Sequence, residues 1–599
     1  MMLSAVNTSP VHIMYLRKKN TWYSVRDGNW TDPNIWSSNG NGRRGHKYPQ
    51  EGDNVVVSHS VLINDNLFVS SGNVINDLTV TGKLSFSNSG APSFNVMGNL
   101  YAENGTIDLT GGSGLQFNVY SAVTRFGTLL PGTLGQVGFV GSCSQYISKP
   151  LSGDFYRIYI FDPKYVYGNI PVTKYVMYDL AGVAVVGSYQ VILELGNYDV
   201  EFNSAGFTLT GYNPPGVIPA LSRKGTGTTV FKGLCTGYSG MDLGNNPVEF
   251  RNGLSGGGTI NAGLVNFTTN NQSIRGSVAT TPTTPVLIGL GLTLTLEGST
   301  AIQGGITGTD AASIFYCSPG SNLTLGGAAS EPMVTGQWNL AGFVTYSFTS
   351  GSFVIKKPSY DNFNIFNSNC AYVLGTDVTC STFSFFQSSL DLANYNLTVN
   401  GAMSIQAAQL KRTGTGNTII KGLFSYGGYS QIDLGSSTLE LQAGLRTLTN
   451  FDNNNWKMGT LLMSTVNQTF SVNNAGNYLN LTGNIEIAPG LTVTNISNIT
   501  VTGNINGQNA SSVFDCQGLT TYQGTQAPMQ TGILRCNTAS NTFDYALKGN
   551  QDVTPGTYRN LTLSGSGIKK LSGNVSVINI YKLSSPATLD NNGFTLTNP

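Results

Sequence analysis

The sequence predicts an all-β protein, a parallel β-helix or β-solenoid built from three degenerate modules of about 200 residues. Three observations lead to this fold. Short alternating strands that end in glycine recur along the chain, adjacent units are spaced like solenoid coils, and segments with the apolar period of a helix are almost absent. Of the 599 residues, 74 are glycine and only 10% are charged, where a typical soluble domain has about 25%. Such a polar, uncharged chain must take its order from β-structure.

Residues 1–20 are predicted to form a basic N-terminal arm. Seven basic and two acidic residues lie within residues 1–50, whereas the whole chain has a net charge of +1. A basic segment ahead of an almost neutral chain favours contact with an acidic partner, and a solvated tail is the alternative. The residues expected to attach the protein to a particle are Arg17, Lys18, Lys19, Arg43 and Arg44.

Residues 21–65 are predicted to form a Trp/Gly-rich cap over the first coil. An open coil exposes unpaired backbone N–H and C=O groups, which invite association between edges. Three of the five tryptophans of the chain lie in this segment, namely Trp22, Trp30 and Trp36. We expect these three residues to close the solenoid.

The coils are predicted from a unit in which an alternating strand ends at a glycine. Alternation places Leu, Val and Ile on one face of the strand and Thr and Asn on the other, and glycine is expected to supply the turn. Adjacent copies of the unit are spaced by 16 residues, from Leu78 to Phe94, or by 20 residues, from Leu479 to Ile499, and this spacing indicates coils of about 20 to 25 residues stacked into a rod. The five copies are LTVTGKL from Leu78, FNVMGNL from Phe94, LTVNGAM from Leu397, LNLTGNI from Leu479 and ITVTGNI from Ile499.

The three modules are predicted from similarities that keep their order along the chain. LSRKGTGTTVFKGL from Leu221 matches LKRTGTGNTIIKGL from Leu410, and SIFYC from Ser313 matches SVFDC from Ser512. Both offsets are about 200 residues, which is the length of one predicted module. The predicted modules are residues 66–254, residues 255–445 and a shorter third copy at residues 446–599.

Part of the cap and a late stretch of the chain carry a family resemblance. The pattern in the cap comprises Trp30, Asp32-Pro33, Trp36, Pro49 and Gly52-Asp53 followed by a run of valines. It resembles the Trp/Gly-rich N-terminal segment of bacterial surface β-helix proteins, which are common in the Bacteroidetes and in the phages that infect them. The stretch PGTYRNLTLSGSGIKKLSGNVSV from Pro555 resembles filamentous repeats of the same group.

The resemblance implies a structural virion protein of a Bacteroidetes-type phage: a tail or head fibre, a spike or a decoration subunit. The N-terminal stretch up to Asn20 makes a poor secretory signal, because its basic residues follow the apolar ones. We therefore expect assembly in the host cytoplasm into a virion, with other virion proteins and host surface glycans as partners and with homotrimers as an expected state. A secreted bacterial adhesin at the cell surface is one alternative.

We expect no nucleic-acid partner and no membrane insertion. The net charge of +1 creates no field that would attract nucleic acid, and no apolar run approaches about 18 residues. The seven cysteines are widely spaced and form no C-x-x-C pair, so they predict neither a disulfide framework nor a zinc site. No cofactor is expected.

We also expect no catalytic residues, although a tailspike glycan depolymerase is the second alternative. The three histidines, at positions 12, 46 and 59, show no metal or triad spacing. Glycoside hydrolysis needs two carboxylates roughly 5 to 10 Å apart. The best candidates are Asp242 with Glu249 and Asp433 with Glu440, but their equivalent places in a duplicated segment favour a role in turns or on a solvated face.

Two aromatic-rich stretches, residues 343–353 and 381–390, have two interpretations. Their rings would form a platform for stacking on sugars, or they would fill the solenoid interior or a subunit interface. The second interpretation is favoured.

Overall fold

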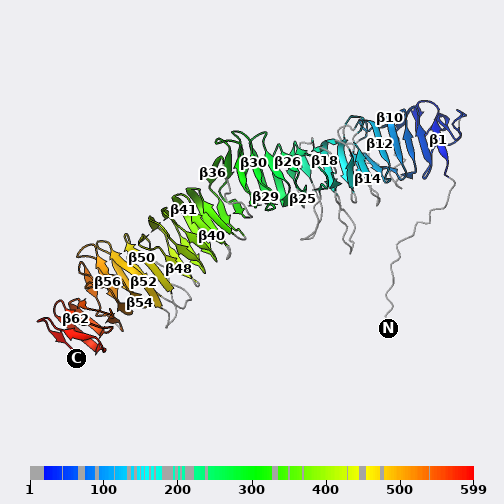
Figure 1. Ribbon diagram of the computed structural model, residues 1–599. Coiled ribbons are helices and arrows are strands. Elements are labelled where there is room, and N and C mark those ends of the chain that lie inside the picture. The colour runs from blue at the N-terminus through cyan, green and yellow to red at the C-terminus, as the bar shows by residue number, and fades with distance from the viewer. Residues whose placement is uncertain are drawn as a thin grey trace, which may run out of the picture. The chain divides into compact units, whose positions relative to one another are not determined.

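The computed structural model describes two units, Met1–Leu294 and Thr295–Pro599. Figure 1 labels their strands. The description covers residues 19–598 except 44, 65–73, 88–92, 113–114, 131–135, 140–144, 149, 154, 161–163, 168–169, 179–192, 196–199, 203–205, 209–220, 237–239, 327–334, 349–350, 367–369, 428–429, 444–453, 472–477 and 539.

The fold is all-β, and a parallel β-solenoid spans residues 55–597. This confirms the predicted fold class. Throughout the described ranges there is no α-helix, and the one helical element is the short 3-10 turn η1 (Pro33–Ile35). Its Asp32 N-cap accepts a hydrogen bond from the backbone N–H of Asn34, as expected for this residue type at a helix start. The division into three modules of about 200 residues stays a prediction.

Unit 1 is a stack of coils whose strands pair in parallel with those of the next coil. Along one sheet, Val55 lies beside Leu78, Leu78 beside Leu100, and Leu100 beside Thr124. All four side chains are buried. The strands are β4 (Asn54–Val57), β7 (Leu78–Val80), β10 (Leu100–Asp108) and β12 (Thr124–Leu130). This register corresponds to coils of about 20 to 25 residues, as predicted.

One of the two spacings read from the sequence is wrong. Leu78 and Phe94 lie in different sheets, because Phe94 in β9 (Ser93–Val96) pairs with Phe117 in β11 (Gln116–Val119). The wider spacing does mark neighbouring coils, since Leu479 lies beside Ile499. Two glycine-ended strands can therefore belong to different sides of one coil.

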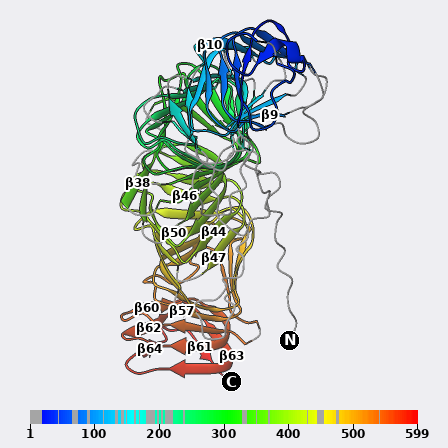
Figure 2. The same ribbon diagram turned by 90° about the vertical axis from the view of Figure 1, so that its right-hand side faces the viewer.

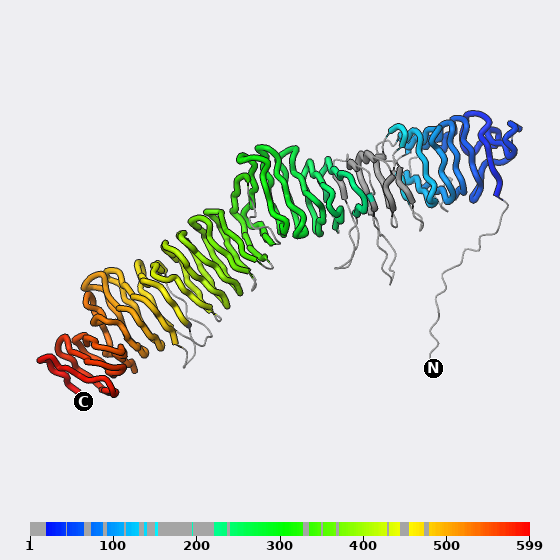
Figure 3. Tube along the Cα trace, viewed as in Figure 1, coloured from blue at the N-terminus to red at the C-terminus, as the bar shows by residue number. Residues whose placement is uncertain are grey.

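Unit 2 continues the same construction with strands stacked in several parallel columns. In Figure 3 the successive coils of this unit, coloured from green to red, lie one upon the next. Leu323, Val344, Phe363, Phe383 and Met403 occupy one inward column, each beside the next. Their strands are β35 (Asn322–Leu325), β37 (Phe343–Tyr346), β39 (Ser359–Phe366), β41 (Val378–Phe386) and β44 (Met403–Gln406).

A second column of unit 2 contains the strands that later border the candidate site. They are β40 (Cys370–Leu374), β42 (Ser389–Asp391), β45 (Gln409–Lys411) and β48 (Gln431–Asp433). Near the C-terminal end of this unit, Figure 2 shows β60 (Gln551–Val553), β62 (Ile568–Leu571) and β64 (Thr588–Asp590) stacked on one side. Each column runs along the stack, so residues one coil apart in sequence become neighbours.

The interior is filled by hydrophobic side chains, with aromatic rings stacked between coils. In unit 1 the rings of Phe231 and Phe250 are stacked with centroids 5.1 Å apart, and Phe267 follows at 5.6 Å. In unit 2 the rings of Phe363 and Phe383 stack at 4.9 Å. Each pair contributes about 0.5 to 1.5 kcal/mol beyond the burial of its area. These ladders bind each coil to the next.

Of the five glycines that end the repeated strands, only Gly483 has a positive φ, of 133°, and the other four have a different role from the one predicted. A Cβ atom at Gly401 would lie 2.5 Å from the backbone oxygen of Ser381 on the preceding coil, and one at Gly503 would overlap the backbone oxygen of Gly483. Neither Gly401 nor Gly503 has a positive φ. The position requires glycine because two coils approach each other closely, and not because the chain turns through a left-handed conformation.

A buried arginine holds an equivalent corner in each unit. Arg412, 5% exposed, donates from Nη1 to the backbone oxygens of Tyr395 and Thr415 and from Nη2 to that of Asn417. Arg223, also 5% exposed, makes the same kind of contact with Thr226. The duplicated R-x-G-T-G segment therefore supplies a buried donor that satisfies carbonyls of its own loop.

A second duplicated turn repeats its geometry within unit 2. The backbone N–H of Gly308 donates to the oxygen of Thr335, and that of Gly507 donates to the oxygen of Thr531, both at 2.7 Å. A Cβ atom at either glycine would lie 2.5 Å from the Cβ of a buried serine. These turns precede the matching SIFYC and SVFDC segments, so the two similar sequences have the same local structure.

The tryptophans of the predicted cap are all buried at the start of unit 1. β1 (Thr21–Ser24) pairs in parallel with β4 and in antiparallel with β3 (Trp36–Ser37). The indole Nε1 of Trp36 donates to the oxygen of Trp30 at 2.7 Å, and the two rings meet edge to face at 5.0 Å. Trp22 donates from Nε1 to the buried carboxylate of Asp53 at 2.8 Å. The antiparallel β3 ends the parallel ladder on this side.

Candidate functional site

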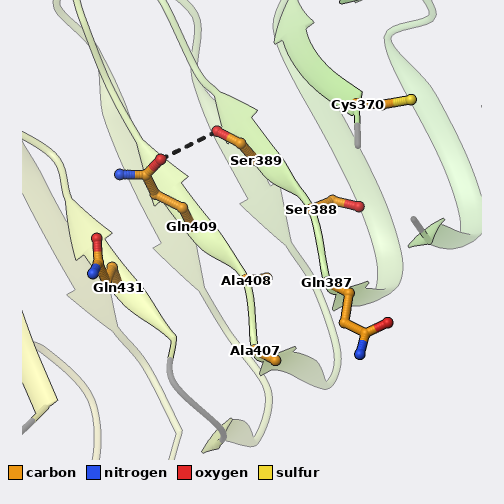
Figure 4. A pocket seen from close by; sticks show the side chains of 8 residues that line it. All are labelled: Cys370, Gln387, Ser388, Ser389, Ala407, Ala408, Gln409 and Gln431. Carbon is orange, nitrogen blue, oxygen red and sulfur yellow. Dashed lines mark hydrogen bonds between the residues drawn. The ribbon is translucent and has the colours of Figure 1, made fainter. Parts of the chain in front are cut away.

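The candidate site is a hollow of about 460 Å³ on the outside of unit 2. Figure 4 shows the side chains around it, which come from three neighbouring coils and the start of β40. The residues that line it are Cys370, Gln387, Ser388, Ser389, Ala407, Ala408, Gln409 and Gln431. We call this feature the Gln/Ser hollow. Its lining is polar and contains no charged side chain.

The Gln/Ser hollow exists because two successive coils turn the same corner. Gln387 links β41 to β42 and Ala407 links β44 to β45, with φ values of 48° and 51°. These left-handed conformations are uncommon for residues other than glycine and bend the chain sharply within one residue. The next residue in each coil, Ser388 or Ala408, is small and buried. Two small residues at stacked corners leave the space that a larger pair would fill.

An outward column of amides and a hydroxyl forms one side of the hollow. Ser389 lies beside Gln409, and Gln409 beside Gln431, on three successive coils. The hydroxyl of Ser389 donates to Oε1 of Gln409 at 3.4 Å, the bond drawn in Figure 4. No described residue hydrogen-bonds to the side-chain amides of Gln387 or Gln431, which line the hollow. These amides are available as donors and acceptors.

Two outward phenylalanines lie on the other side of the corner. Phe366 ends β39 and Phe386 ends β41, directly beside it in the next coil. Their ring centroids are 5.7 Å apart, and Phe366 is 42% exposed. Gln406 continues this column on the third coil. The site therefore combines an outward aromatic pair, one ring exposed and one half-buried, with amides, a combination that suits a ligand with apolar faces and many hydroxyls.

The strands that border the hollow also hold a column of charged residues of alternating sign. Asp391, Lys411, Asp433 and Lys457 lie beside one another on successive coils, with alternating sign. Nζ of Lys457 is 3.1 Å from a carboxylate oxygen of Asp433. Opposite charges side by side on neighbouring strands stabilise the pairing modestly. This column thus adds no net charge beside the Gln/Ser hollow.

Cys370 belongs to the wall of the hollow and is not a reactive group. The residue is 4% exposed, and its thiol donates to the backbone oxygen of Phe348 at 2.9 Å. Burial raises the pKa of the Cys370 thiol, so the thiolate that a nucleophile requires is disfavoured. All the other cysteines in the described part of the chain are likewise unpaired and buried, while Cys143 lies outside it.

The aspartates of the two predicted acid pairs sit in turns. Asp242 accepts a hydrogen bond from the backbone N–H of Gly244, and Asp433 accepts one from Gly435. The two glycines have φ values of 57° and 59°, so the same turn occurs twice. An aspartate that bonds to the N–H two residues ahead stabilises such a turn. This geometry favours the structural interpretation of both aspartates.

The glutamates of the same pairs are held by their neighbours. Glu249 receives two bonds from the guanidinium of Arg251, at 2.9 and 3.2 Å, and one from the hydroxyl of Thr269. Burial would raise the pKa of Glu249, but these bonds hold it below its ordinary value. Glu440 accepts from the hydroxyl of Ser464 at 2.6 Å and from Gln442. Neither glutamate lines the Gln/Ser hollow.

The histidines and the basic residues are spread over the N-terminal segment. Nδ1 of His59 lies 2.9 Å from the backbone oxygen of Ser24 and 3.2 Å from the Ser24 hydroxyl. Lys19 donates to Oδ1 of Asn76 on the solenoid, whereas Arg43 and His46 are not buried. The other predicted residues outside the described part of the chain are Arg17, Lys18, Arg44 and His12.

The two aromatic-rich stretches divide between both interpretations. Tyr346, Phe348, Phe353, Phe383 and Phe385 are buried in the interior, as the favoured interpretation predicts. Outward positions hold Phe343, which is 44% exposed, and the half-buried Phe386. Phe366, between the two stretches, was not singled out from the sequence. The alternation of buried and outward residues along this strand would have indicated from the sequence that the Phe366 side chain points outward.

Comparisons with known proteins give no relative on which to rest an assignment. No protein-family model, no curated protein and no solved structure matches this chain at a significant level. Within the described residues, no helix is long and apolar enough to cross a membrane, and no group of three or more His, Cys, Asp or Glu side chains is placed to hold a metal ion.

Proposed function

We propose that this chain is a non-catalytic structural protein of a bacteriophage exterior, such as a tail or head fibre, a spike or a decoration subunit, and that it contacts host surface glycan. The observation that supports the glycan contact is the Gln/Ser hollow, with the exposed Phe366 and the half-buried Phe386 at the same corner and no carboxylate in its lining. Sugars present hydroxyls that suit amides and apolar ring faces that suit phenylalanine. The proposal also divides the coils into three modules. It further includes binding of the protein to other virion proteins.

Two alternatives predict other results. A glycan depolymerase needs a pair of available carboxylates, and the best pairs are engaged in turns and ion pairs. A secreted bacterial adhesin would use the same hollow at a cell surface instead of on a particle. Purified protein incubated with surface glycans is expected to bind without releasing reducing ends, whereas glycan cleavage would establish the depolymerase.

The phenylalanine pair gives the direct test of the binding surface. The double variant Phe366→Ala, Phe386→Ala should lower glycan affinity about tenfold or more, because stacking of an aromatic ring is worth about 1 kcal/mol per contact. Isothermal titration calorimetry against surface glycans measures this change. Phe594→Ala is the matched control, because Phe594 is 38% exposed and lies in the last coils of unit 2. Equal affinity of the double variant and the control would contradict the proposed surface.

The N-terminal arm gives the test of particle attachment. Deleting residues 1–19 removes Arg17, Lys18 and Lys19 but keeps the buried tryptophans, so the protein should fold and fail to join particles that lack it. Raising the salt to about 1 M should weaken attachment of the full chain, because the screening length falls to about 3 Å. Co-sedimentation at both salt concentrations measures incorporation. Equal incorporation of full-length and truncated protein would place the attachment site elsewhere.

A further inference from the structure

We propose that the Gln/Ser hollow binds an uncharged linear glycan whose chain runs along the stack, across successive coils. This inference rests on the proposed glycan contact and specifies its chemistry and direction. Three features carry it: the direction in which like side chains repeat, the absence of charge, and the amides that lack a partner among the described residues.

The direction follows from the columns that border the hollow. Ser389, Gln409 and Gln431 repeat along the stack, one per coil, at the strand spacing of about 4.8 Å. Phe366 and Phe386 repeat in the same direction on the other side of the corner. A glycan lying along the stack meets one polar group for each coil it crosses. A glycan lying across the coils would meet this chemistry only once.

The charge of the ligand follows from what the hollow lacks. An acidic sugar that leaves water needs a cation or several donors for its carboxylate or sulfate. The lining contains no Lys, Arg, Asp or Glu, and the nearby lysines alternate with aspartates on neighbouring coils. An acidic glycan therefore gains neither a direct partner nor a favourable field. A neutral glycan can satisfy the amides without this loss.

The amides also suit hydroxyl groups in particular. A side-chain amide offers two N–H donors and a carbonyl acceptor, and a hydroxyl both donates and accepts. Gln387 and Gln431 present such amides at opposite ends of the hollow. Gln409 lies on the coil between them. The glycan must be several sugars long to reach both ends, since the outer strands of the Ser389 column are about 10 Å apart.

The test uses an array of linear oligosaccharides from one to six sugars long. Neutral glucan, mannan, galactan and xylan chains are compared with hyaluronan and polygalacturonate. We expect at least one neutral series to bind, with affinity rising about tenfold or more from the monosaccharide to the tetrasaccharide, as two further hydrogen bonds would produce. We expect the acidic chains to bind more weakly than neutral chains of equal length.

Substitutions of the glutamines that line the hollow test whether the oligosaccharides bind there. Gln409→Ala and Gln431→Ala should each lower the affinity for the tetrasaccharide about fivefold and leave that for the monosaccharide less changed. Gln508→Ala, which removes an exposed amide far from the hollow, is the matched control. Circular dichroism of each variant checks that the fold is kept.

The outcomes separate this inference from the proposed function. If acidic chains bind more tightly than neutral ones through the same residues, or if affinity does not depend on length, the inference is wrong and the glycan contact stands. If no chain of either kind binds at millimolar concentration, both are wrong. If binding survives in both glutamine variants, the hollow is not the site.

Discussion

Replacing Arg412 with methionine is expected to destabilise the surrounding coils by about 3 to 5 kcal/mol. The guanidinium is 5% exposed and donates to the backbone oxygens of Tyr395, Thr415 and Asn417. Methionine keeps much of the volume but supplies no donor. Each buried carbonyl that loses its partner costs about 1 to 3 kcal/mol.

Native-state hydrogen exchange measures this effect locally, which is appropriate because a long stack of coils does not unfold in one step. Protection should fall in β46 (Asn417–Ile420), which follows the arginine loop, and in β43 (Leu397–Val399), which pairs with β46. Arg275→Met is the control, because Arg275 is exposed in β29 (Gln272–Thr280) and the same substitution should change protection little. Similar losses in both variants would show that the buried hydrogen bonds of Arg412 contribute little.

Replacing Trp36 with alanine is expected to destabilise the first coils of unit 1 by about 3 to 5 kcal/mol. Trp36 is fully buried, and its loss removes both the ring contact with Trp30 and the Nε1 hydrogen bond. The backbone around Trp36 is held by the pairing of β1 with both β3 and β4, which limits its collapse into the cavity. Loss of protection should be largest in β1 and β4 and should fade along the stack.

The half-buried Trp338 provides a control for the effect of replacing the fully buried Trp36. Trp338→Ala removes a tryptophan from β36 (Gln337–Leu340), where the ring is only partly covered and lies 5.9 Å from Phe315. It should cost clearly less than Trp36→Ala. Trp36→Phe keeps a buried ring and isolates the Nε1 bond, at about 1 kcal/mol. If Trp36→Ala left exchange in β1 unchanged, the tryptophans would not close this end.

The alternating strands and their coil length could be predicted from the sequence because both depend on local pattern. Leu479 and Ile499 show this, since the alternating strand around the first recurs around the second and the two residues lie side by side. The shorter spacing between Leu78 and Phe94 misled because a coil has several sides. Sequence shows that a strand recurs, but the path of the chain around the coil decides which sheet receives it.

The glycine motif was recognised for the wrong physical reason. Glycine serves both left-handed turns and close backbone contacts, and the one-dimensional pattern is the same for both. At Gly503 the constraint is the oxygen of Gly483, which belongs to the preceding coil. A contact between two coils depends on the distance between their backbones at that position, and the sequence does not give this distance.

The Gln/Ser hollow could not be found from the sequence, because its residues look ordinary one at a time. Gln387 and Ala407 are not typical of left-handed corners, and nothing in the residues Ser388 and Ala408 signals that both sit at stacked corners. The buried Arg412 was missed in the same way, since a basic residue in a Gly/Thr-rich segment normally indicates a solvated loop. Both features arise when residues from successive coils meet.

The shared corner of the coils around the Gln/Ser hollow also affects how the length of this protein can change during evolution. Gln387 and Ala407 occupy the same place on successive coils, with almost the same φ. Loss of residues 388–407 would join Gln387 directly to Ala408 and would keep the strands of the remaining coils in register. Recombination between coils can therefore shorten or lengthen the stack and keep the strand register. In the same event it adds or removes one position in the column of Ser389 and one in the column of Phe386, so under the proposed glycan contact the length of the bound glycan would change together with the length of the protein.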